Sequence, residues 1–493
     1  MSLCGSFELP TRRIELELAQ PCLVIDAAEQ AGIVLNTSCA RLGTCGGCAV
    51  DLLQGRFELA GQTVTVGPPD RKRVLGCQCT ILSDRWRIAV PRRSLVETHE
   101  TFLVDFDLRP TFNLQPLARK IRLHLPRPSL EDSVGDFERI CRTLRRDHGF
   151  ERIRPTLRVL QQLPELIAQA DYQLTVTLAE NYGLWEMVQV EPGDTSDRLF
   201  AIAADIGTTT VACCLIDLTT GRIIDSASCY NQQIQRCDDV ASRIVSAQQP
   251  DRLRELQQLI VGQTINKLIS LLCRNNGLRP DEVVRLVVSG NTVMAHLFLG
   301  INPKNMGGVP FQPGTSGPGT FRARPLAVGI NPDGFVDIVP SISAYVGGDI
   351  ISDIHVAGLA RQQGLALLID VGTNGEMAVG NADRILACAT PAGPAFEGGG
   401  ITCGTRATAG AIHALTIESD SLAAACQVIA DLKPIGVCGS GLIDFLAEAR
   451  RVGLIDHAGR FNPRLVGTCP YLRQTASHDR GRFEYVLVPR QAT

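Results

Sequence analysis

Three cysteines lie close together near the start of the chain: Cys39, Cys45 and Cys48, in C-x5-C-x2-C spacing. A fourth, Cys77, follows further along, within the segment Leu-Gly-Cys-Gln. Thiolates at such spacing allow one chain to surround an iron–sulfur cluster. The glycines in the loop allow the backbone to approach the bridging sulfides closely. The pattern therefore predicts a [2Fe–2S] cluster bound by these four cysteines.

The segments on either side of this loop fit a small β-rich domain over residues 1–95. We expect strands at 14–18, 48–53 and 86–90. The first of these alternates polar and apolar residues, as a half-buried strand does. Asp26 can cap a helix over 27–31, which Gly32 would end. Strands, one helix and then a cysteine loop resemble the β-grasp fold of ferredoxins.

The choice of fourth ligand lies between Cys77 and Cys79. The Leu-x-Cys-Gln segment resembles the corresponding ferredoxin motif and favours Cys77. A zinc site is the alternative reading of four cysteines, but structural zinc usually takes two C-x2-4-C pairs. This chain offers one clean pair, so the cluster is the preferred interpretation.

The stretch after this domain carries no residue pattern that suggests chemistry. Residues 96–118 are expected to be a linker, because prolines occur near both ends and no hydrophobic period is sustained. Residues 119–197 are expected to form a small α+β middle domain. We expect strands at 120–125 and 174–178, and a helix at 130–145 capped by Ser129.

An internal repeat marks the rest of the chain, residues 198–493. An apolar strand runs into Asp205 and the sequence Asp-Ile-Gly-Thr-Thr-Thr. A second apolar strand runs into Asp370 and the sequence Asp-Val-Gly-Thr-Asn-Gly. The separation is too long for a solenoid, so two related halves facing one another are predicted.

Turns rich in glycine and threonine present N–H groups and hydroxyls that suit phosphate oxygens. The predicted phosphate contacts are Gly207, Thr208, Thr209 and Thr210 in the first half and Gly372, Thr373, Asn374 and Gly375 in the second. Asp205 and Asp370, one before each turn, can hold a hydrated Mg²⁺. The paired motifs resemble the actin/Hsp70/sugar-kinase ATPase superfamily, so ATP with Mg²⁺ is the expected ligand.

Two further segments are candidates for the same ATP site. Asp349 can orient the attacking water or the metal, or it can cap a helix that begins near Ile350. The glycine-rich turn 436–441 is expected to open a helix at 442–450. Its Gly439 and Ser440 are predicted to contact the nucleotide, and the alternative is that they pack on a sheet.

A ferredoxin domain joined to such an ATPase resembles the reductive activators of corrinoid proteins. More specific marks of that family are the segments 289–300, 393–398 and 434–444. The resemblance implies that ATP hydrolysis drives one electron from the [2Fe–2S] cluster to a corrinoid protein, reducing Co(II) to Co(I). It also implies a methyltransferase system as partner, an external low-potential reductant and a homodimer.

One departure from that family lies at the end of the chain. The family continues well beyond the segment matching 486–488, so we expect an ATPase domain that lacks its C-terminal part. This leaves an alternative function: an iron–sulfur electron carrier, or an activator of another low-potential enzyme, with an inert or partial ATPase domain. A sugar or acetate kinase is disfavoured because it has no use for a cluster.

Composition narrows the remaining classes. The formal net charge is −3, with no basic or acidic tail, so no nucleic-acid partner is expected. No uncharged apolar run reaches the length of a membrane-spanning helix, and no signal peptide is apparent. The eighteen cysteines are dispersed along the chain, which predicts a cytoplasmic protein with reduced thiols.

Overall fold

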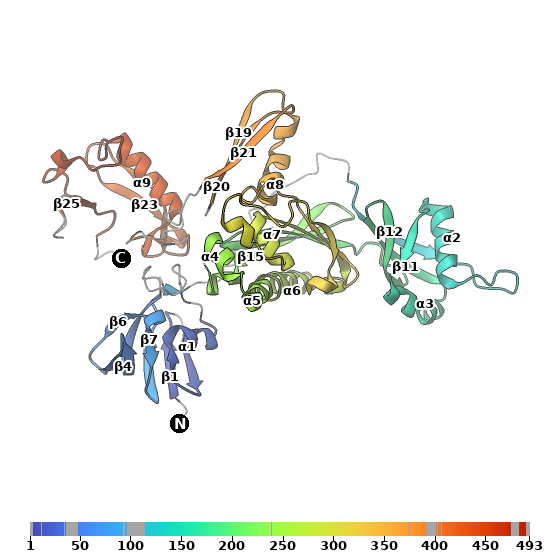
Figure 1. Ribbon diagram of the computed structural model, residues 1–493, viewed down its shortest axis with the longest axis horizontal. Coiled ribbons are helices and arrows are strands. Elements are labelled where there is room, and N and C mark those ends of the chain that lie inside the picture. The colour runs from blue at the N-terminus through green and yellow to red at the C-terminus, as the bar shows by residue number, and fades with distance from the viewer. Residues whose placement is uncertain are drawn as a thin grey trace. The chain divides into compact units, whose positions relative to one another are not determined.

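The chain divides into two compact units (Figure 1). One unit comprises residues 98–370 and 376–389, and the other comprises 1–97, 371–375 and 390–493. The computed structural model describes residues 3–10, 12–33, 35, 48–91, 94–95, 114–237, 239–372, 374–390, 401, 403–405, 407–474 and 483–489. Within these ranges, no helix combines the length and the apolar character needed to cross a membrane.

The N-terminal domain is a mixed sheet with one helix. Its strands are β1 (Leu3–Glu8), β2 (Arg13–Leu18), β3 (Cys22–Leu23), β4 (Ala49–Leu59), β5 (Gln62–Val66), β6 (Lys72–Leu75), β7 (Cys79–Ile81) and β8 (Arg85–Ala89). The order is β2-β1-β8-β4-β7-β3, and β5 and β6 also pair with β4. Strands β1 and β8 run parallel, and the rings of Phe7 and Trp86 meet edge to face in the core. The three predicted strands are present, and β4 is longer than expected.

Helix α1 (Val24–Gln30) begins earlier than predicted. The expected cap, Asp26, lies in the first turn, and Leu23 occupies the N-cap position without a side-chain hydrogen bond. Burial of apolar side chains from Val24 onward sets the start of the helix instead. The predicted end is confirmed, since Gly32 adopts φ of +72° and its N–H donates to Glu29.

The small domain over residues 118–192 has a four-stranded sheet in the order β10-β12-β11-β9. Its elements are β9 (Ala118–His124), α2 (Asp136–His148), β10 (Ile153–Pro155), α3 (Leu157–Gln169), β11 (Gln173–Asn181) and β12 (Leu184–Pro192). The prediction of a helix from 130 capped by Ser129 is wrong. Ser129 closes a turn with Asp132, whose carboxylate accepts a hydrogen bond from the buried Arg139, so α2 begins only at Asp136.

Polar contacts tie this domain to the first half of the repeat, within the same compact unit. Arg158 Nε lies 2.7 Å from the Asp333 carboxylate. Arg285 Nη1 donates to the carbonyls of Leu117 (3.2 Å) and Glu180 (2.8 Å), and its guanidinium also pairs with Asp337. Several charge-assisted hydrogen bonds across one boundary favour rigid attachment.

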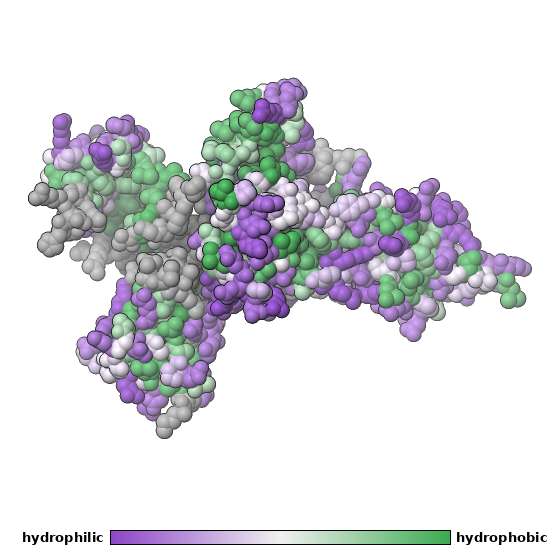
Figure 2. Space-filling view, viewed as in Figure 1, coloured by the Kyte–Doolittle hydropathy of each residue, from purple (hydrophilic) through white to green (hydrophobic). Residues whose placement is uncertain are grey.

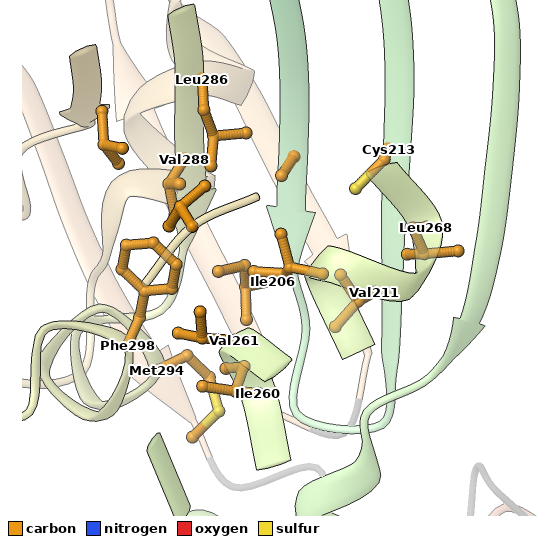
Figure 3. Close-up of a cluster of buried hydrophobic side chains, with 14 of the residues drawn as sticks. Ile206, Val211, Cys213, Ile260, Val261, Leu268, Leu286, Val288, Met294 and Phe298 are labelled. Carbon is orange, nitrogen blue, oxygen red and sulfur yellow. The ribbon is translucent and has the colours of Figure 1, made fainter. Parts of the chain in front are cut away.

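The first half of the repeat is a six-stranded sheet in the order β15-β14-β13-β16-β18-β17. Its strands are β13 (Phe200–Ile206), β14 (Thr210–Asp217), β15 (Arg222–Tyr230), β16 (Val283–Gly290), β17 (Gly319–Arg322) and β18 (Phe335–Ile338). Its helices are α4 (Val240–Ser246), α5 (Pro250–Ile260), α6 (Asn266–Asn275), α7 (Thr292–Leu299) and α8 (Gly348–Ala357). Figure 3 shows side chains of β13, β14 and β16 meeting those of α5, α6 and α7 in the core.

The second half begins with a smaller sheet of β19 (Ala366–Val371), β20 (Gly375–Gly380) and β21 (Ile385–Thr390), which lies beside α8 (Figure 1). Its inner face packs on Ile350 and Ile354 of α8. Alternate residues of β19, such as Leu367 and Ile369, are exposed, and Figure 2 shows this hydrophobic surface. The predicted repeat of strand, turn and strand is therefore present in both halves.

The described residues from 411 onward form a small core around β22 (Ala411–Ile417), β23 (Ala424–Val428), β24 (Gly436–Val437) and α9 (Gly439–Arg451). A short hairpin follows, β25 (Leu472–Gln474) and β26 (Phe483–Tyr485). The prediction that α9 begins at 442 is wrong. Cys438 is the N-cap residue, so the glycine-rich turn already forms the first turn of α9. A Cβ atom on Gly441 would lie 2.5 Å from the Ile412 carbonyl oxygen, so glycine allows this turn to approach β22 closely.

Candidate functional site

Two of the four predicted cluster ligands lie within the described residues, and the fold brings them together. Cys48 immediately precedes β4, and Cys77 lies in a short 3-10 turn, Gly76–Gln78. Their Sγ atoms are 3.3 Å apart, and the Gly76 N–H donates to the Cys48 carbonyl at 2.9 Å. Cys39 and Cys45 lie outside the described residues.

The neighbouring thiol of Cys79 lies in the same buried core as Cys48 and Cys77. It is fully buried in the domain core, and burial raises its pKa to about 12. A thiol that resists ionisation is a poor metal ligand, because the thiolate is the binding form. Two soft sulfur donors from separate segments, Cys48 and Cys77, fit an iron–sulfur cluster, and their Sγ–Sγ distance of 3.3 Å favours Cys77 as the partner of Cys48.

The first predicted phosphate turn, residues 207–209, connects β13 to β14 in an antiparallel hairpin. Asn291 lies at the N-terminus of α7 and contacts this turn. Its Nδ2 donates to Thr208 Oγ1 at 3.1 Å, while its Oδ1 caps the helix by accepting from the N–H of Met294. The end of β16 thus supports the turn, and the predicted contact Thr210 begins β14.

Five carboxyl groups lie near the ends of β13 and β19 and the starts of β20 and α8 and raise one another's pKa: Asp205, Asp349, Asp353, Asp370 and Glu376. Burial and mutual repulsion raise the pKa of Asp205 and of Asp349 to about 6 and that of Glu376 to about 7. Asp205 retains solvent access although protein surrounds its carboxyl group. Such clustering disfavours ionisation until a cation arrives.

Asp353 and Glu376 were not predicted from the sequence. Asp353 follows Asp349 by one turn of α8, so both lie on the same helix face. Glu376 directly follows the second glycine-rich turn and is buried, with 6% of its surface exposed. The spacing of four along α8 was the signal available for Asp353. A buried glutamate at a strand start gives no comparable signal.

Asp349 does not cap a helix beginning at Ile350, so that interpretation is wrong. The helix begins at Gly348 with Gly347 as N-cap, and Asp349 accepts from the Ile350 N–H at 2.9 Å. A Cβ atom on Gly347 would lie 2.5 Å from the Asn291 Cα, so only glycine allows this approach. The close packing brings the first turn of α8 to the end of β16.

Within the described residues, no three carboxylate, histidine or cysteine side chains converge closely enough to bind a metal ion directly. A hydrated Mg²⁺, the predicted ligand, keeps several waters and takes ligands from substrate phosphates. The carboxylates would then act through water. The role of Asp205, Asp370 and Asp349 toward Mg²⁺ remains a prediction.

The other predicted nucleotide contacts lie in the second compact unit. Within the second turn the Gly372 N–H donates to the Asn374 carbonyl at 3.0 Å, and Gly375 begins β20. Thr373 lies outside the described residues, as does the predicted family segment 393–398. Ser440 Oγ donates to the His413 carbonyl at 2.7 Å, and Gly439 opens α9. Their contact with nucleotide remains a prediction.

Four family models match successive parts of the chain. Residues 8–82 match the 2Fe-2S iron-sulfur cluster binding domain, and 107–197 match the RACo linker region. Residues 200–362 match the RACo middle region, and 364–493 match the C-terminal domain of RACo, the ASKHA domain.

Similar proteins cover most of the chain. The corrinoid activation enzyme RamQ of Eubacterium limosum is 30% identical over 459 residues, which is 92% of this chain and 72% of RamQ. A [Co(II) methylated amine-specific corrinoid protein] reductase of Methanosarcina barkeri is 29% identical over 139 residues, 24% of this chain and 26% of the reductase. A solved structure of a reductive activator for corrinoid, iron-sulfur protein matches with a TM-score of 0.68 and 34% identity, covering 98% of this chain and 77% of that one.

A [2Fe–2S] ferredoxin-like domain followed by ASKHA-type segments defines an iron–sulfur protein with an attached nucleotide-binding domain. The chain belongs to the RACo family, the reductive activators of corrinoid proteins. The predicted fold class and family are confirmed. The expectation that the ATPase domain lacks its C-terminal part stays a prediction, and the ASKHA model matches residues 364–493.

Proposed function

We propose that this protein is an ATP-hydrolysing activator that delivers one electron to a corrinoid protein and reduces Co(II) to Co(I). The observation that carries the proposal is the match to RamQ across 92% of the chain, from the cysteine domain into the ASKHA segment. A relative that shared only the ferredoxin domain would support an electron carrier and no more.

The cysteine domain is proposed to hold the electron before transfer. The proposed ligands of the [2Fe–2S] cluster are Cys39, Cys45, Cys48 and Cys77. Such a cluster accepts and releases one electron at a potential of about −400 mV in plant-type ferredoxins. The Sγ atoms of Cys48 and Cys77 are 3.3 Å apart. A backbone hydrogen bond from the Gly76 N–H to the Cys48 carbonyl supports this arrangement. An external low-potential reductant would resupply the electron.

The ATPase part is proposed to make an unfavourable transfer possible. The Co(II)/Co(I) couple is expected to lie below the cluster, so the electron does not move without help. Nucleotide can help only by binding one conformation better than another. The turn at 207–209 would hold phosphate oxygens, and Asp205 and Asp370 would orient a hydrated Mg²⁺ against them. Asp349 would orient the attacking water. A homodimer is part of the proposal.

The test mixes the dithionite-reduced protein, freed of excess dithionite, with a Co(II) corrinoid protein and follows Co(I) absorbance. Co(I) is expected with MgATP and absent without it. An Asp205→Asn variant is expected to lower the rate at least tenfold, because it removes one charge from the proposed Mg²⁺ site. The exposed Glu58→Gln provides a charge-matched control in the ferredoxin domain and should leave the rate unchanged.

Equal Co(I) formation with and without MgATP would contradict the proposal and favour a simple electron carrier. No Co(I) under either condition, with an intact cluster signal and several corrinoid proteins tried, would favour an activator of a different low-potential enzyme.

A further inference from the structure

Buried hydrogen-bond donors contact the backbone carbonyls of the first predicted phosphate turn, residues 207–209. Asn231 Nδ2 donates to the Gly207 carbonyl at 2.9 Å, and Arg243 Nη2 donates to the Thr208 carbonyl at 2.7 Å. The Asn231 backbone N–H donates to the Thr209 carbonyl at 2.8 Å. Three successive carbonyl oxygens of the turn therefore each accept a hydrogen bond from Asn231 or Arg243.

Both donor residues are fully buried and are themselves fixed. Arg243 on α4 donates from Nε to the Cys237 carbonyl at 3.1 Å and from Nη1 to Gln233 Oε1 at 3.0 Å. Asn231 Oδ1 accepts from the Gln233 backbone N–H at 3.1 Å. Each has 0% of its surface exposed. Burying a guanidinium is unfavourable unless its donors are satisfied, and one of its donors is used on the turn.

The direction of the carbonyls fixes the direction of the amides. In a planar trans peptide, the N–H points opposite to the C=O of the same peptide unit. Because the Gly207 and Thr208 carbonyls point toward Asn231 and Arg243, the N–H groups of Thr208 and Thr209 point away from that buried core. Amides aligned in this way suit anionic oxygens.

We infer that Arg243 and Asn231 are positioning residues that orient the first turn for the phosphates of the nucleotide. The inference rests on the proposed function, because it deepens the account of the same ATP site. Neither residue contacts the nucleotide; both act through the turn. A charged donor on the Thr208 carbonyl also polarises that peptide and strengthens its N–H as a donor.

The experiment measures MgATP binding to the full-length protein by isothermal titration calorimetry. Arg243→Gln is expected to raise the dissociation constant about tenfold or more, the usual effect of losing a hydrogen bond to a charged group. Arg243→Lys keeps the charge and one donor, so it should recover part of the affinity. The matched control is Arg236→Gln, because Arg236 precedes the same helix but pairs with Glu255 at 2.6 Å and does not contact the turn. That control should bind as wild type does.

The thermal unfolding midpoint and the [2Fe–2S] signal establish that each variant is folded. Partial rescue by Arg243→Lys, with an unchanged unfolding midpoint, is the signature that a merely structural role would not give. If Arg243→Gln fails to fold, the MgATP affinity of Asn231→Asp tests the inference instead. This substitution keeps the acceptor for Gln233 but places an oxygen where the donor to Gly207 stood, so it should weaken MgATP binding to a similar degree.

The outcomes separate the inference from the proposed function. A wild-type protein that does not bind MgATP overturns the proposed function and this inference with it. Wild-type binding combined with variants of Arg243 and Asn231 that stay within twofold overturns the inference alone. A loss of affinity in Arg236→Gln equal to that in Arg243→Gln also overturns it.

Discussion

At the scale of single residues, a group of carboxyl side chains near the first predicted phosphate turn has strongly raised pKa values. Burial comes first among the causes that raise the pKa of Glu376 to about 7, followed by repulsion from Asp349, Asp370 and Asp353. An ionised carboxylate held among others costs stability that a cation would restore. The unfavourable charge density is the expected state of a Mg²⁺–phosphate site before its ligands bind.

Glu376→Gln should stabilise the nucleotide-free protein at alkaline pH. The folded pKa is raised from an ordinary value of 4.5, so the charged form penalises the folded state above pH 7, and the penalty fades as pH falls through 7 toward 4.5. Removing the charge should raise the free energy of unfolding by about 1 to 3 kcal/mol at pH 8. Urea unfolding at pH 8 and pH 5 measures this, with Glu58→Gln as control. If Glu376→Gln is no more stable than wild type at pH 8, Glu376 is not destabilised by its neighbouring carboxyl groups.

His296 has the opposite pH dependence. Its Nδ1 lies 2.7 Å from the Thr292 carbonyl, and Nε2 accepts from the Gly314 N–H at 3.0 Å. The Nε2 contact requires an unprotonated nitrogen and hence the neutral ring. Burial lowers the pKa of His296 and outweighs the opposite effect of the hydrogen bond to the Thr292 carbonyl. Below the ordinary pKa near 6.5, the unfolded state binds a proton that the folded state does not bind. The free energy of unfolding therefore decreases as the pH is lowered, by up to about 1.4 kcal/mol per pH unit.

Comparison with His296→Gln isolates this contribution, since glutamine keeps an acceptor for Gly314 and does not titrate. The free energy of unfolding of wild type should fall more than that of the variant between pH 7 and pH 5. Parallel pH profiles for the two proteins would contradict a neutral His296.

At the scale of elements, the cysteine-bearing turn gives a direct contrast between two neighbouring thiols. Cys77→Ser is expected to abolish the [2Fe–2S] signal, because it removes a proposed ligand. Cys79→Ser should keep that signal and lower the unfolding free energy by about 1 to 3 kcal/mol, because it places a hydroxyl in an apolar core. Electron paramagnetic resonance of the dithionite-reduced variants measures the difference. Loss of the cluster in Cys79→Ser alone would reverse the ligand assignment.

Sequence patterns predicted the strands better than the helix starts. Alternation along 14–18 and the apolar runs before Asp205 and Asp370 depend on side chains of the strand itself, and β2, β13 and β19 follow them. Helix starts depend on capping contacts that the sequence does not reveal. Ser129 could have capped a helix, but its turn with Asp132 delays α2 to Asp136.

The candidate site was predictable to a similar extent. Asp205 and Asp370 carry a spaced motif, whereas Arg243 and Asn231 act on the first turn only through tertiary contacts. No local period marks such residues, since their partners are distant in sequence. Glu376 was missed for a related reason, because its burial depends on packing of the small sheet against α8.

At the scale of the whole molecule, the family match joins a cluster domain at residues 8–82 to an ASKHA segment at 364–493 in one chain. Hydrogen bonds and ion pairs of Arg285 and Arg158 connect the small domain of β9 to β12 to the first half of the repeat. These contacts favour movement of that domain together with the phosphate turn at 207–209. Nucleotide binding can then be coupled to electron delivery if the nucleotide binds more tightly to one arrangement of the domains than to another.

The most direct test of ATP-driven electron delivery is one electron paramagnetic resonance measurement on the reduced protein mixed with a Co(II) corrinoid protein. The reduced [2Fe–2S] cluster and Co(II) both give signals, so donor and acceptor are counted in the same spectrum. With MgATP, both signals should decrease in equal amounts, and without it both should persist. Loss of the Co(II) signal while the cluster signal stays, or equal losses without MgATP, would contradict the account.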